Sequence, residues 1–246
     1  MTFSKATAQI DGVRSVHKTG TIVPFPRAYA GNWSNAYGLA LKRCFDLLFA
    51  CVALVITAPA LLVALIAIPI QSRGWPLFVQ RRVGKNGRFF NILKLRTMYV
   101  GSDSYDFKTA SGDSRLTAVG KILRKTNIDE LPQLINVLIG DMSLIGPRPL
   151  SADETNYIAD ALNLDSDHPG FIPKMRPGLV GLEQVNRVRD LTYRDRFAYN
   201  EEYESCWTLS NDARIFLRGL LVCKDVCMIS LLGALLVGIL FLISFA

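Results

Sequence analysis

An uncharged run of 24 residues from Leu47 to Ile70 constrains the fold of this chain more than any other feature. At about 1.5 Å per residue, a straight helix of this length would cross the hydrocarbon core of a bilayer. Pro59 lies in the middle of the run, where its missing backbone N–H bends a helix. Both ends are basic, with Lys42 and Arg43 before the run and Arg73 after it, and basic flanks favour the cytoplasmic side of a membrane.

Two arrangements of this run remain open. A re-entrant helical hairpin over residues 42–72, broken near Ala58-Pro59, keeps both basic flanks on one membrane face. A proline-kinked span explains the bend but places one basic flank on the far side. We favour the re-entrant hairpin, with Lys42, Arg43 and Asp46 at its start.

The charge of the chain is concentrated beside this run. Half of the 246 residues are hydrophobic and the net charge is +7. No acidic residue lies between Asp46 and Asp103, and seven basic residues do. Beside an apolar segment, such a region favours an anionic leaflet or a phosphorylated substrate. Nucleic acid is not an expected partner, because no known nucleic-acid-binding module accompanies the charge.

The cysteines and histidines do not predict a metal centre. The five cysteines form no Cys-x-x-Cys pair, and the chain has two histidines, so a zinc site is not expected. We interpret the cysteines as small apolar packing residues of a reduced compartment.

A β-hairpin is predicted between Leu77 and Leu95. Apolar and aromatic residues flank the segment Lys85-Asn86-Gly87-Arg88, and Asn-Gly is a strong signal for a tight turn. The aromatic residues near this turn suit a surface at the level of lipid headgroups. An ordinary half-buried hairpin with a solvated basic face is the alternative interpretation.

Helical periodicity dominates the rest of the central region. Apolar residues recur at helical spacing over residues 118–126 and 128–139, and Gly140 is placed to end the second helix. Residues 212–227 form an amphipathic pattern, with basic residues on one side.

The predicted fold is α+β and mostly helical, as a monotopic membrane protein with a re-entrant hairpin, a small β-hairpin and amphipathic interfacial helices. Residues 1–36 lack apolar periodicity and are expected to form a disordered or loosely docked tail. One domain is expected over residues 37–225. The uncharged end of the chain predicts an apolar helix over residues 226–246.

The adjacent acids Asp129 and Glu130 are the strongest candidates for chemistry. One interpretation is structural, since Asn127-x-x-Glu130 fits a capping box and acids favour a helix N-terminus. The functional interpretation gives the two acids separate tasks. One carboxylate can attack an activated phosphorus, and the other can hold Mg²⁺. Arg124 and Arg148, the latter between two prolines, suit phosphate binding and favour this second interpretation.

Seven short motifs extend this pattern along the chain. They are Lys42-Arg43-x-x-Asp46, Lys94-x-Arg96-Thr97-Met98, Asp113-x-Arg115-x-Thr117, Asp129-Glu130-Leu131-Pro132-Gln133, Gly140-Asp141-Met142-Ser143, Gly146-Pro147-Arg148-Pro149 and Arg176-Pro177-Gly178. With these motifs the chain resembles, from about residue 42 to residue 220, the bacterial sugar transferases known as monotopic phosphoglycosyl transferases. Any one motif is weak, but all seven occur in the order found in that family.

The resemblance implies a specific reaction. Such enzymes move a sugar 1-phosphate from a nucleotide diphosphate sugar onto polyprenyl phosphate, at the cytoplasmic face of the bacterial inner membrane. It implies Asp129 as the nucleophile, which holds the phosphosugar covalently, and Glu130 as the ligand of a Mg²⁺ cofactor. Arg124, Lys94 and Arg148 are then expected at the substrate phosphates. Supporting roles are expected for Arg96, Asp113, Arg115, Asp141, Pro147, Pro149 and Arg176.

The same resemblance implies the partners. These are a nucleotide diphosphate sugar, polyprenyl phosphate and membrane phospholipids, and a homo-oligomer or downstream glycosyltransferases as protein partners. It also supports the re-entrant hairpin, with its break at a small residue followed by proline. Here Ala58 precedes Pro59 where the family commonly has serine, so a hydroxyl at the break is missing.

Further departures fall in the C-terminal third. Val180 stands where the family commonly has threonine, Arg187-Val188 replaces Gly-Arg, and Asn200 replaces an aspartate. These changes concern recognition of the nucleotide or sugar and leave the acid pair intact. They keep two alternatives open: a non-catalytic relative that binds lipid or a partner, and a phosphohydrolase that passes the phosphoryl group to water.

Overall fold

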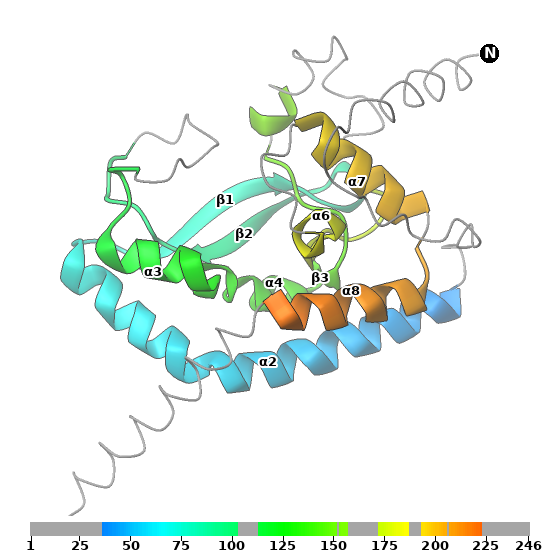
Figure 1. The fold of residues 1–246 in the computed structure, drawn as a ribbon, viewed down its shortest axis with the longest axis horizontal. Helices are drawn as coiled ribbons and strands as arrows, with labels where there is room; N and C mark the ends of the chain where they lie inside the picture. The colour runs from blue at the N-terminus through cyan, green and yellow to red at the C-terminus, as the bar shows by residue number, and fades with distance from the viewer. Residues whose placement is uncertain are drawn as a thin grey trace, which may run out of the picture.

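The computed structural model describes residues 36–102, 113–151, 153–156, 172–186, 193–205 and 207–222. Over these residues the fold is α+β and mostly helical, as predicted (Figure 1). It contains two small two-stranded sheets, of which the sequence predicts one, the hairpin. The predicted tail lies outside the described residues apart from residue 36, and the predicted apolar helix at 226–246 lies wholly outside them.

The uncharged run forms most of a single helix, α2 (Ala36–Gln71), that bends along its length (Figure 1). The sequence predicts a break at Ala58-Pro59, but the helix continues through it. Pro59 removes only one hydrogen bond of the helical ladder, which bends a helix without ending it. The Thr57 hydroxyl donates to the Ala53 carbonyl at 2.7 Å, a contact that also bends helices. Thr57 thus provides the hydroxyl whose absence was expected from Ala58.

Much of α2 is exposed and apolar. The segment Gly38–Gln71 is long and apolar enough to cross a membrane, and 22% of its most apolar window is buried. A core helix of a soluble protein would be mostly buried, so this helix is consistent with membrane association. Its exposed large apolar side chains are Leu41, Phe45, Leu47, Leu48, Val52, Val55, Ile56, Leu62, Val63, Ile66 and Ile70.

The predicted β-hairpin is confirmed. Strands β1 (Leu77–Val83) and β2 (Phe89–Leu95) pair antiparallel, with Val83 opposite Phe89. The turn η2 (Lys85–Gly87) requires positive φ at Asn86 (55°) and Gly87 (76°), which is why Asn-Gly marks it.

The two predicted central helices are largely confirmed. Helix α3 (Ala118–Thr126) has the predicted bounds, and Thr117 accepts a capping hydrogen bond from the Gly120 amide. The predicted helix at 128–139 is divided into η3 (Ile128–Glu130) and α4 (Gln133–Ile139). Pro132 causes the division because it has no N–H to donate to the Ile128 carbonyl. Gly140 ends α4 in a left-handed conformation, as predicted (φ 106°).

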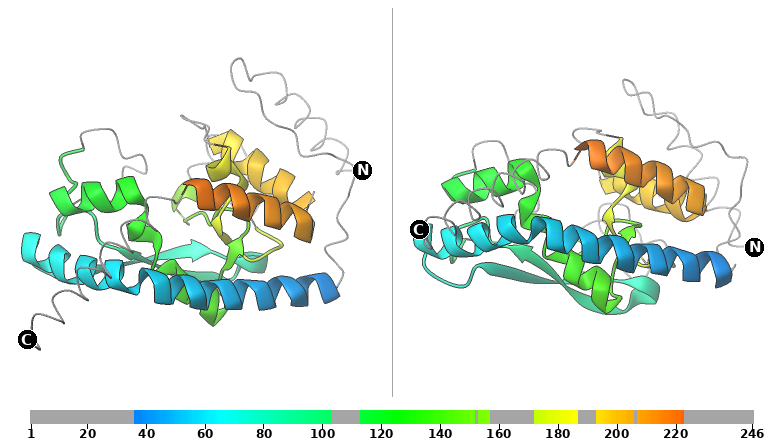
Figure 2. Two further views of the ribbon diagram at one scale, coloured as in Figure 1. Left: turned by 60° about the horizontal axis from the view of Figure 1, so that its bottom comes forward. Right: turned by 90° about the horizontal axis from the view of Figure 1, so that it is seen from below.

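The remaining elements lie over the first half of α2 (Figures 1 and 2). They are β3 (Ser143–Ile145), β4 (Gly178–Val180), α6 (Leu182–Val185), α7 (Tyr193–Ser205) and α8 (Leu209–Val222). Strands β3 and β4 pair in parallel. Their backbones lie very close together after β3 ends, because a Cβ on Gly178 would lie 2.1 Å from the Gly146 nitrogen. The amphipathic helix predicted at 212–227 begins earlier, at Leu209, and its end lies outside the described residues.

The two halves of α2 pack against two separate apolar cores. Its first half contributes Ala50 to a core built largely from α4, β3, α7 and α8, with Met142 and Trp207 fully or almost fully buried. Its second half packs against the end of β2, α3 and η3 in a smaller core. That core consists of Ala60, Ala64, Ile68, Leu95, Leu123 and Ile128. Figure 2 shows how α2 runs beneath both groups of elements.

A buried ion pair joins the start of α2 to α8. The Lys42 ammonium lies 2.6 Å from Asp212 and 3.9 Å from Asp46, and donates to the Ile145 carbonyl at 2.9 Å. Asp46 in turn accepts a hydrogen bond from the Ser143 hydroxyl at 2.7 Å. Lys42 and Asp46, predicted at the start of the membrane hairpin, therefore dock α2 onto β3 and α8.

Arg43, the third residue of this motif, binds the end of α4. Its guanidinium donates to the carbonyls of Val137 at 2.7 Å and Leu138 at 3.1 Å. Arg176 donates from Nε to the Gly140 carbonyl at 2.8 Å. Cations at the C-terminus of a helix satisfy its unpaired carbonyls, so both arginines stabilise the end of α4.

Candidate active site

The acid pair lies on η3, held by the turn that precedes it. Asn127 adopts a left-handed conformation (φ 56°) and ends α3, with its amide donating to the Arg124 and Leu123 carbonyls. Its side chain makes no capping hydrogen bond to the turn that follows. The capping-box interpretation of Asn127 and Glu130 is therefore wrong, because Asn127 closes one helix and does not cap the next.

Asp129 is a buried carboxyl group in an apolar setting. Its neighbour Ile128 belongs to the smaller core, and Asp129 itself is 8% exposed. Burial and the nearby Glu130 charge raise the pKa of Asp129 to about 6, against the opposing effect of Lys94 and Arg124. Asp129 is therefore a more basic carboxylate than an exposed aspartate at neutral pH.

Glu130 has the opposite character. Burial would raise the pKa of Glu130, but the charges of Lys94 and Arg148 outweigh it and hold the pKa below its ordinary value. The Lys94 ammonium lies 2.6 Å from Oε1 of Glu130. Two adjacent acids with pKa values moved in opposite directions suit two different tasks.

Three residues of the motif that begins at Lys94 make contacts at or near the site. Thr97 accepts a hydrogen bond from Nε of Arg124 at 2.9 Å, so this arginine is held beside β2. Arg96 donates to the carbonyls of Ser72 and Gly74, directly after α2. Arg96 therefore joins the end of α2 to the hairpin, and its supporting role in the reaction stays a prediction.

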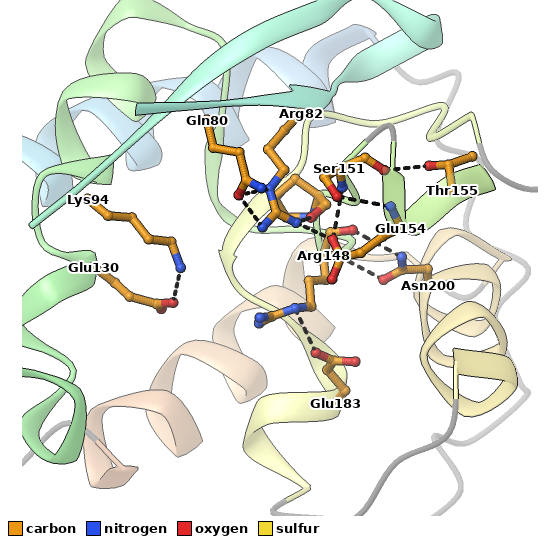
Figure 3. A network of polar contacts seen from close by, with 11 residues as sticks. Gln80, Arg82, Lys94, Glu130, Arg148, Ser151, Glu154, Thr155, Glu183 and Asn200 are labelled. Atoms are coloured by element: carbon orange, nitrogen blue, oxygen red, sulfur yellow. Dashed lines mark hydrogen bonds and ion pairs between the residues drawn. The ribbon is translucent and has the colours of Figure 1, made fainter. Parts of the chain in front are cut away.

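Arg148 is held at both its backbone and its side chain (Figure 3). Its amide donates to Oδ1 of Asn200 at 2.8 Å, and Nδ2 of Asn200 donates back to its carbonyl at 3.2 Å. Nε of Arg148 lies 3.3 Å from a carboxylate oxygen of Glu183. The Glu183 and Glu130 charges outweigh burial and raise the pKa of Arg148, so it is a permanent cation.

Arg82 holds the loop that carries Arg148. It donates to the Pro149 carbonyl at 3.0 Å and pairs with Glu154 at 2.5 Å (Figure 3). Its Nη2 also donates to Oε1 of Gln80 at 2.7 Å. The neighbouring prolines are buried, and the Pro147 carbonyl accepts from the Gly178 amide at 2.9 Å. Pro147 and Pro149 thus lie in the loop that carries Arg148, and their supporting role in the reaction stays a prediction.

Sequence reasoning missed Arg82, Glu154 and Glu183. Arg82 falls within the basic region, and its strand position does not reveal that its side chain is half-buried and paired with Glu154. Glu183 and Glu154 lie in no recognised motif. Asn200 could be identified from the sequence, because it departs from the family pattern.

The structure brings part of the predicted site together. Lys94, Glu130 and Arg148 line one cavity, and Arg124 and Asp129 lie beside it on α3 and η3. The other residues that line it are Arg82, Ile92, Gln133, Pro149, Gly178, Leu179 and Gln184.

The other predicted supports do not line this cavity. Asp113 and Arg115 pair with each other, at 2.6 Å between Oδ2 and Nη2, and hydrogen bonds from Arg115 lower the pKa of Asp113 to about 2. The Arg124 charge lowers this pKa further, so Asp113 lies within reach of that arginine. Asp141 and Arg176 lie at the far end of β2, by the hairpin turn, and line a different cavity.

The residues of the site fit a Mg²⁺ ion that is completed by substrate. In the described part of the chain, no three or more His, Cys, Asp or Glu side chains are placed to hold a metal. Mg²⁺ commonly binds one or two carboxylates and takes its other ligands from water and substrate phosphates. The ion pair with Lys94 engages one oxygen of Glu130, and Asp129 is adjacent in sequence. Glu130 is therefore suited to hold the ion together with a bound diphosphate.

Comparison with known proteins supports one family. Residues 37–225 match the family described as bacterial sugar transferase. The chain is 43% identical over 185 residues to the UDP-glucose:undecaprenyl-phosphate glucose-1-phosphate transferase of Caulobacter vibrioides, a match that covers 72% of this chain and 67% of that protein. It is 36% identical over 187 residues to the exopolysaccharide production protein ExoY of Rhizobium meliloti, covering 70% and 80%. It is 35% identical over 195 residues to the undecaprenyl-phosphate galactose phosphotransferase of Salmonella typhimurium, covering 72% and 39%. The chain belongs to the bacterial sugar transferase family.

Proposed function

We propose that this chain transfers a sugar 1-phosphate from a UDP-sugar to undecaprenyl phosphate, as a membrane step of exopolysaccharide synthesis. The relatives named for this activity with glucose and galactose are 35–43% identical to the chain. The observation that carries the proposal is the acid pair. Asp129 has a raised pKa, Glu130 has a lowered pKa, and cations from three elements surround them.

The reaction proceeds in two displacements at Asp129. Its carboxylate attacks the phosphorus attached to the sugar, forming an acyl phosphate, and the bond to the nucleoside monophosphate breaks. An oxygen of undecaprenyl phosphate then attacks the same phosphorus, which forms the lipid-linked diphosphate sugar and releases the Asp129 carboxylate. Because the phosphosugar stays on Asp129 between the steps, a soluble donor and a lipid acceptor can use one site in turn.

The cations near Asp129 make the first attack possible. A carboxylate and a diphosphate repel each other unless fixed positive charges lie between them. Lys94 and Arg148 flank Glu130, and Arg124 lies on the other side of the acid pair. A Mg²⁺ ion held by Glu130 would supply further charge neutralisation at the diphosphate.

The long apolar helix supports a membrane location for this chemistry. We infer that α2 enters the bilayer and returns, with its bend at Pro59 in the lipid and the acid pair at the cytoplasmic face. The support is the basic residue on each flank, the bend, and the exposed apolar face of α2. Labelling cysteines placed at Ala40 and Trp75 from each side of sealed vesicles tests this, since access from opposite sides would exclude it.

The proposed function is tested by the mass of the intact protein. Incubation with Mg²⁺ and a UDP-sugar, without lipid acceptor, is expected to add the mass of one sugar phosphate. Asp129→Asn should show no increase, because an amide does not attack phosphorus at a useful rate. Near wild-type turnover by folded Asp129→Asn would exclude Asp129 as the nucleophile.

Adding the lipid acceptor separates the remaining alternatives. Undecaprenyl phosphate is expected to remove the added mass and to yield a lipid-linked diphosphate sugar. Free sugar phosphate would indicate a hydrolase. No mass increase with any UDP-sugar, in folded protein, would favour a non-catalytic relative.

A further inference from the structure

A second cavity lies at the opposite end of the hairpin from the acid pair. Its volume is about 360 Å³, and its lining includes Lys85, Arg88, Gly140, Asp141 and Arg176. Lys94, at the acid pair, lies six residues beyond Arg88 along β2. At about 3.3 Å per residue this is roughly 20 Å, so the cavity is separate from the reaction centre.

Backbone hydrogen bonds hold the walls of this cavity together. In the hairpin turn, the Gly84 amide donates to the Arg88 carbonyl at 2.8 Å. The Asn86 amide donates to the Pro173 carbonyl at 2.7 Å, which joins the turn to the segment that carries Arg176. Arg176 in turn binds the end of α4 through Nε. The cavity is therefore formed by three segments in fixed contact and does not depend on one surface loop.

The charges that line the cavity are mostly positive. Lys85, Arg88 and Arg176 are exposed, and none of them forms an ion pair with a carboxylate in the described part of the chain. Asp141 is the one acidic residue among the lining residues. Arg176 donates from Nε to the Gly140 carbonyl, which leaves its two terminal nitrogens available to a ligand. Three cations against one carboxylate favour an anionic ligand, above all phosphate.

An adjoining cavity extends the positive charge toward α2. It has a volume of about 280 Å³, shares Lys85 and Arg176 with the first, and is also lined by Arg43 and Lys174. Arg43 precedes the uncharged run of α2 in the sequence. The positive region therefore extends to the N-terminal part of α2.

Exposed apolar side chains border the cavity directly. Phe89, next to Arg88, is 50% exposed, and Ile139, next to Gly140, is 68% exposed. Large apolar side chains at the edge of a cationic cavity are suited to a ligand with a phosphate head and an apolar tail. A free phosphate ion would gain nothing from them.

We propose that this cavity binds the anionic headgroup of a membrane phospholipid, through Lys85, Arg88 and Arg176. The bound lipid anchors the hairpin turn to the leaflet, as a second attachment besides α2. The inference does not depend on the proposed transferase activity, because the cavity contains neither Asp129 nor Glu130.

Native mass spectrometry of the full-length protein in detergent tests this inference. Phosphatidylglycerol is expected to bind the wild type more tightly than phosphatidylcholine. Lys85→Gln/Arg88→Gln should weaken phosphatidylglycerol binding about tenfold, from the loss of two charge-assisted hydrogen bonds, and leave phosphatidylcholine unchanged. The control Lys121→Gln/Lys125→Gln removes the same charge from exposed positions of α3 and should behave as wild type.

Three results would overturn the inference. They are equal binding of the two lipids by the wild type, an equal loss in the α3 control, and displacement of phosphatidylglycerol by inorganic phosphate at matched concentration. Arg88→Gln alone, in protein with an unchanged melting temperature, guards against a folding defect. Loading of Asp129 with sugar phosphate should be unchanged in all these variants, so failure of the lipid site and failure of the transferase activity are distinguishable.

Discussion

Adjacent carboxyl groups in this protein differ in pKa because their surroundings differ. Asp129 is buried beside the smaller core, whereas Glu130 is subject to the charges of Lys94 and Arg148. The raised pKa suits Asp129 to the proposed role of nucleophile, and the lowered pKa suits Glu130 to the proposed role of ligand for a cation.

Loading of Asp129 should depend on pH with a midpoint near 6. The raised pKa means that Asp129 is mostly protonated at pH 5 and mostly ionised at pH 7, and only the carboxylate attacks phosphorus. The rate of sugar-phosphate loading is expected to be about tenfold lower at pH 5 than at pH 7. Single-turnover mass measurements check this, with circular dichroism at each pH as the control. A rate that stays constant down to pH 4.5 would contradict the raised pKa.

Asn200→Asp should impair donor binding, although the resemblance to the family implies aspartate at this position. An aspartate still accepts from the Arg148 amide but cannot donate to the Arg148 carbonyl, and its charge faces that carbonyl. The loss of one hydrogen bond, about 1 kcal/mol, corresponds to roughly a fivefold higher KM for the UDP-sugar, with kcat changed less. Steady-state kinetics give both constants.

The matched control for this substitution is Asn91→Asp, at an exposed position of β2. It introduces the same charge away from Arg148 and should leave KM unchanged. A wild-type KM in Asn200→Asp would mean that the contact with Arg148 does not position it.

At the scale of elements, the sequence predicted the features that depend on one or two neighbouring residues. Asn86-Gly87 identified the hairpin turn because both residues need positive φ, and Gly140 identified the end of α4. The three-residue strands β3 and β4 could not be predicted, since their pairing joins Ser143 to Gly178 across the chain. The same limit explains the site: the acid pair was predicted from its motif, whereas Glu183 contacts Arg148 only through tertiary structure.

Pro59→Ala should slow the loading of Asp129. Alanine restores the missing N–H and favours a straight helix by about 3 kcal/mol in local propensity. A straighter α2 moves Ala60 and Ala64 away from Ile128, which supports the acid pair. We expect loading about tenfold slower, measured by intact mass.

Pro69→Ala provides the comparison within the same helix. Pro69 lies near the end of α2 and belongs to neither apolar core, so its replacement gains helix propensity without disturbing the support of η3. Equal loading rates in the two variants would exclude a role for the bend in placing Asp129.

Across the whole molecule, a buried ion pair connects the apolar helix to the last described element. Lys42 and Asp212 are both buried and lie 2.6 Å apart. Asp212 also accepts hydrogen bonds from Tyr203 and Trp207, so it collects three donors from three parts of the chain. This carboxylate therefore joins α2 to α8, in addition to the contacts of Asp46 with Ser143 and of Arg43 with the end of α4.

Asp212→Asn should destabilise the whole protein. Removing one partner of a buried pair leaves the Lys42 charge incompletely compensated, which typically costs about 3–5 kcal/mol. For a chain of this size each kcal/mol lowers the melting temperature by about 2–4 °C, so a decrease of roughly 10 °C is expected. Thermal unfolding in detergent measures it. Asp153→Asn, at an exposed position, is the control, and an equally small shift in both variants would show that the pair contributes little.

The order of synthesis gives this ion pair a further consequence. Lys42 leaves the ribosome 170 residues before its partner Asp212, and at about 5–20 residues per second this is an interval of roughly ten to thirty seconds. During that time α2 is already made, while α8 is not. Lys42 can meanwhile keep its ammonium group in water at the membrane surface. In the arrangement that we propose, α2 can therefore enter the lipid before α8 is made, and α8 then packs against a helix that is already in the membrane.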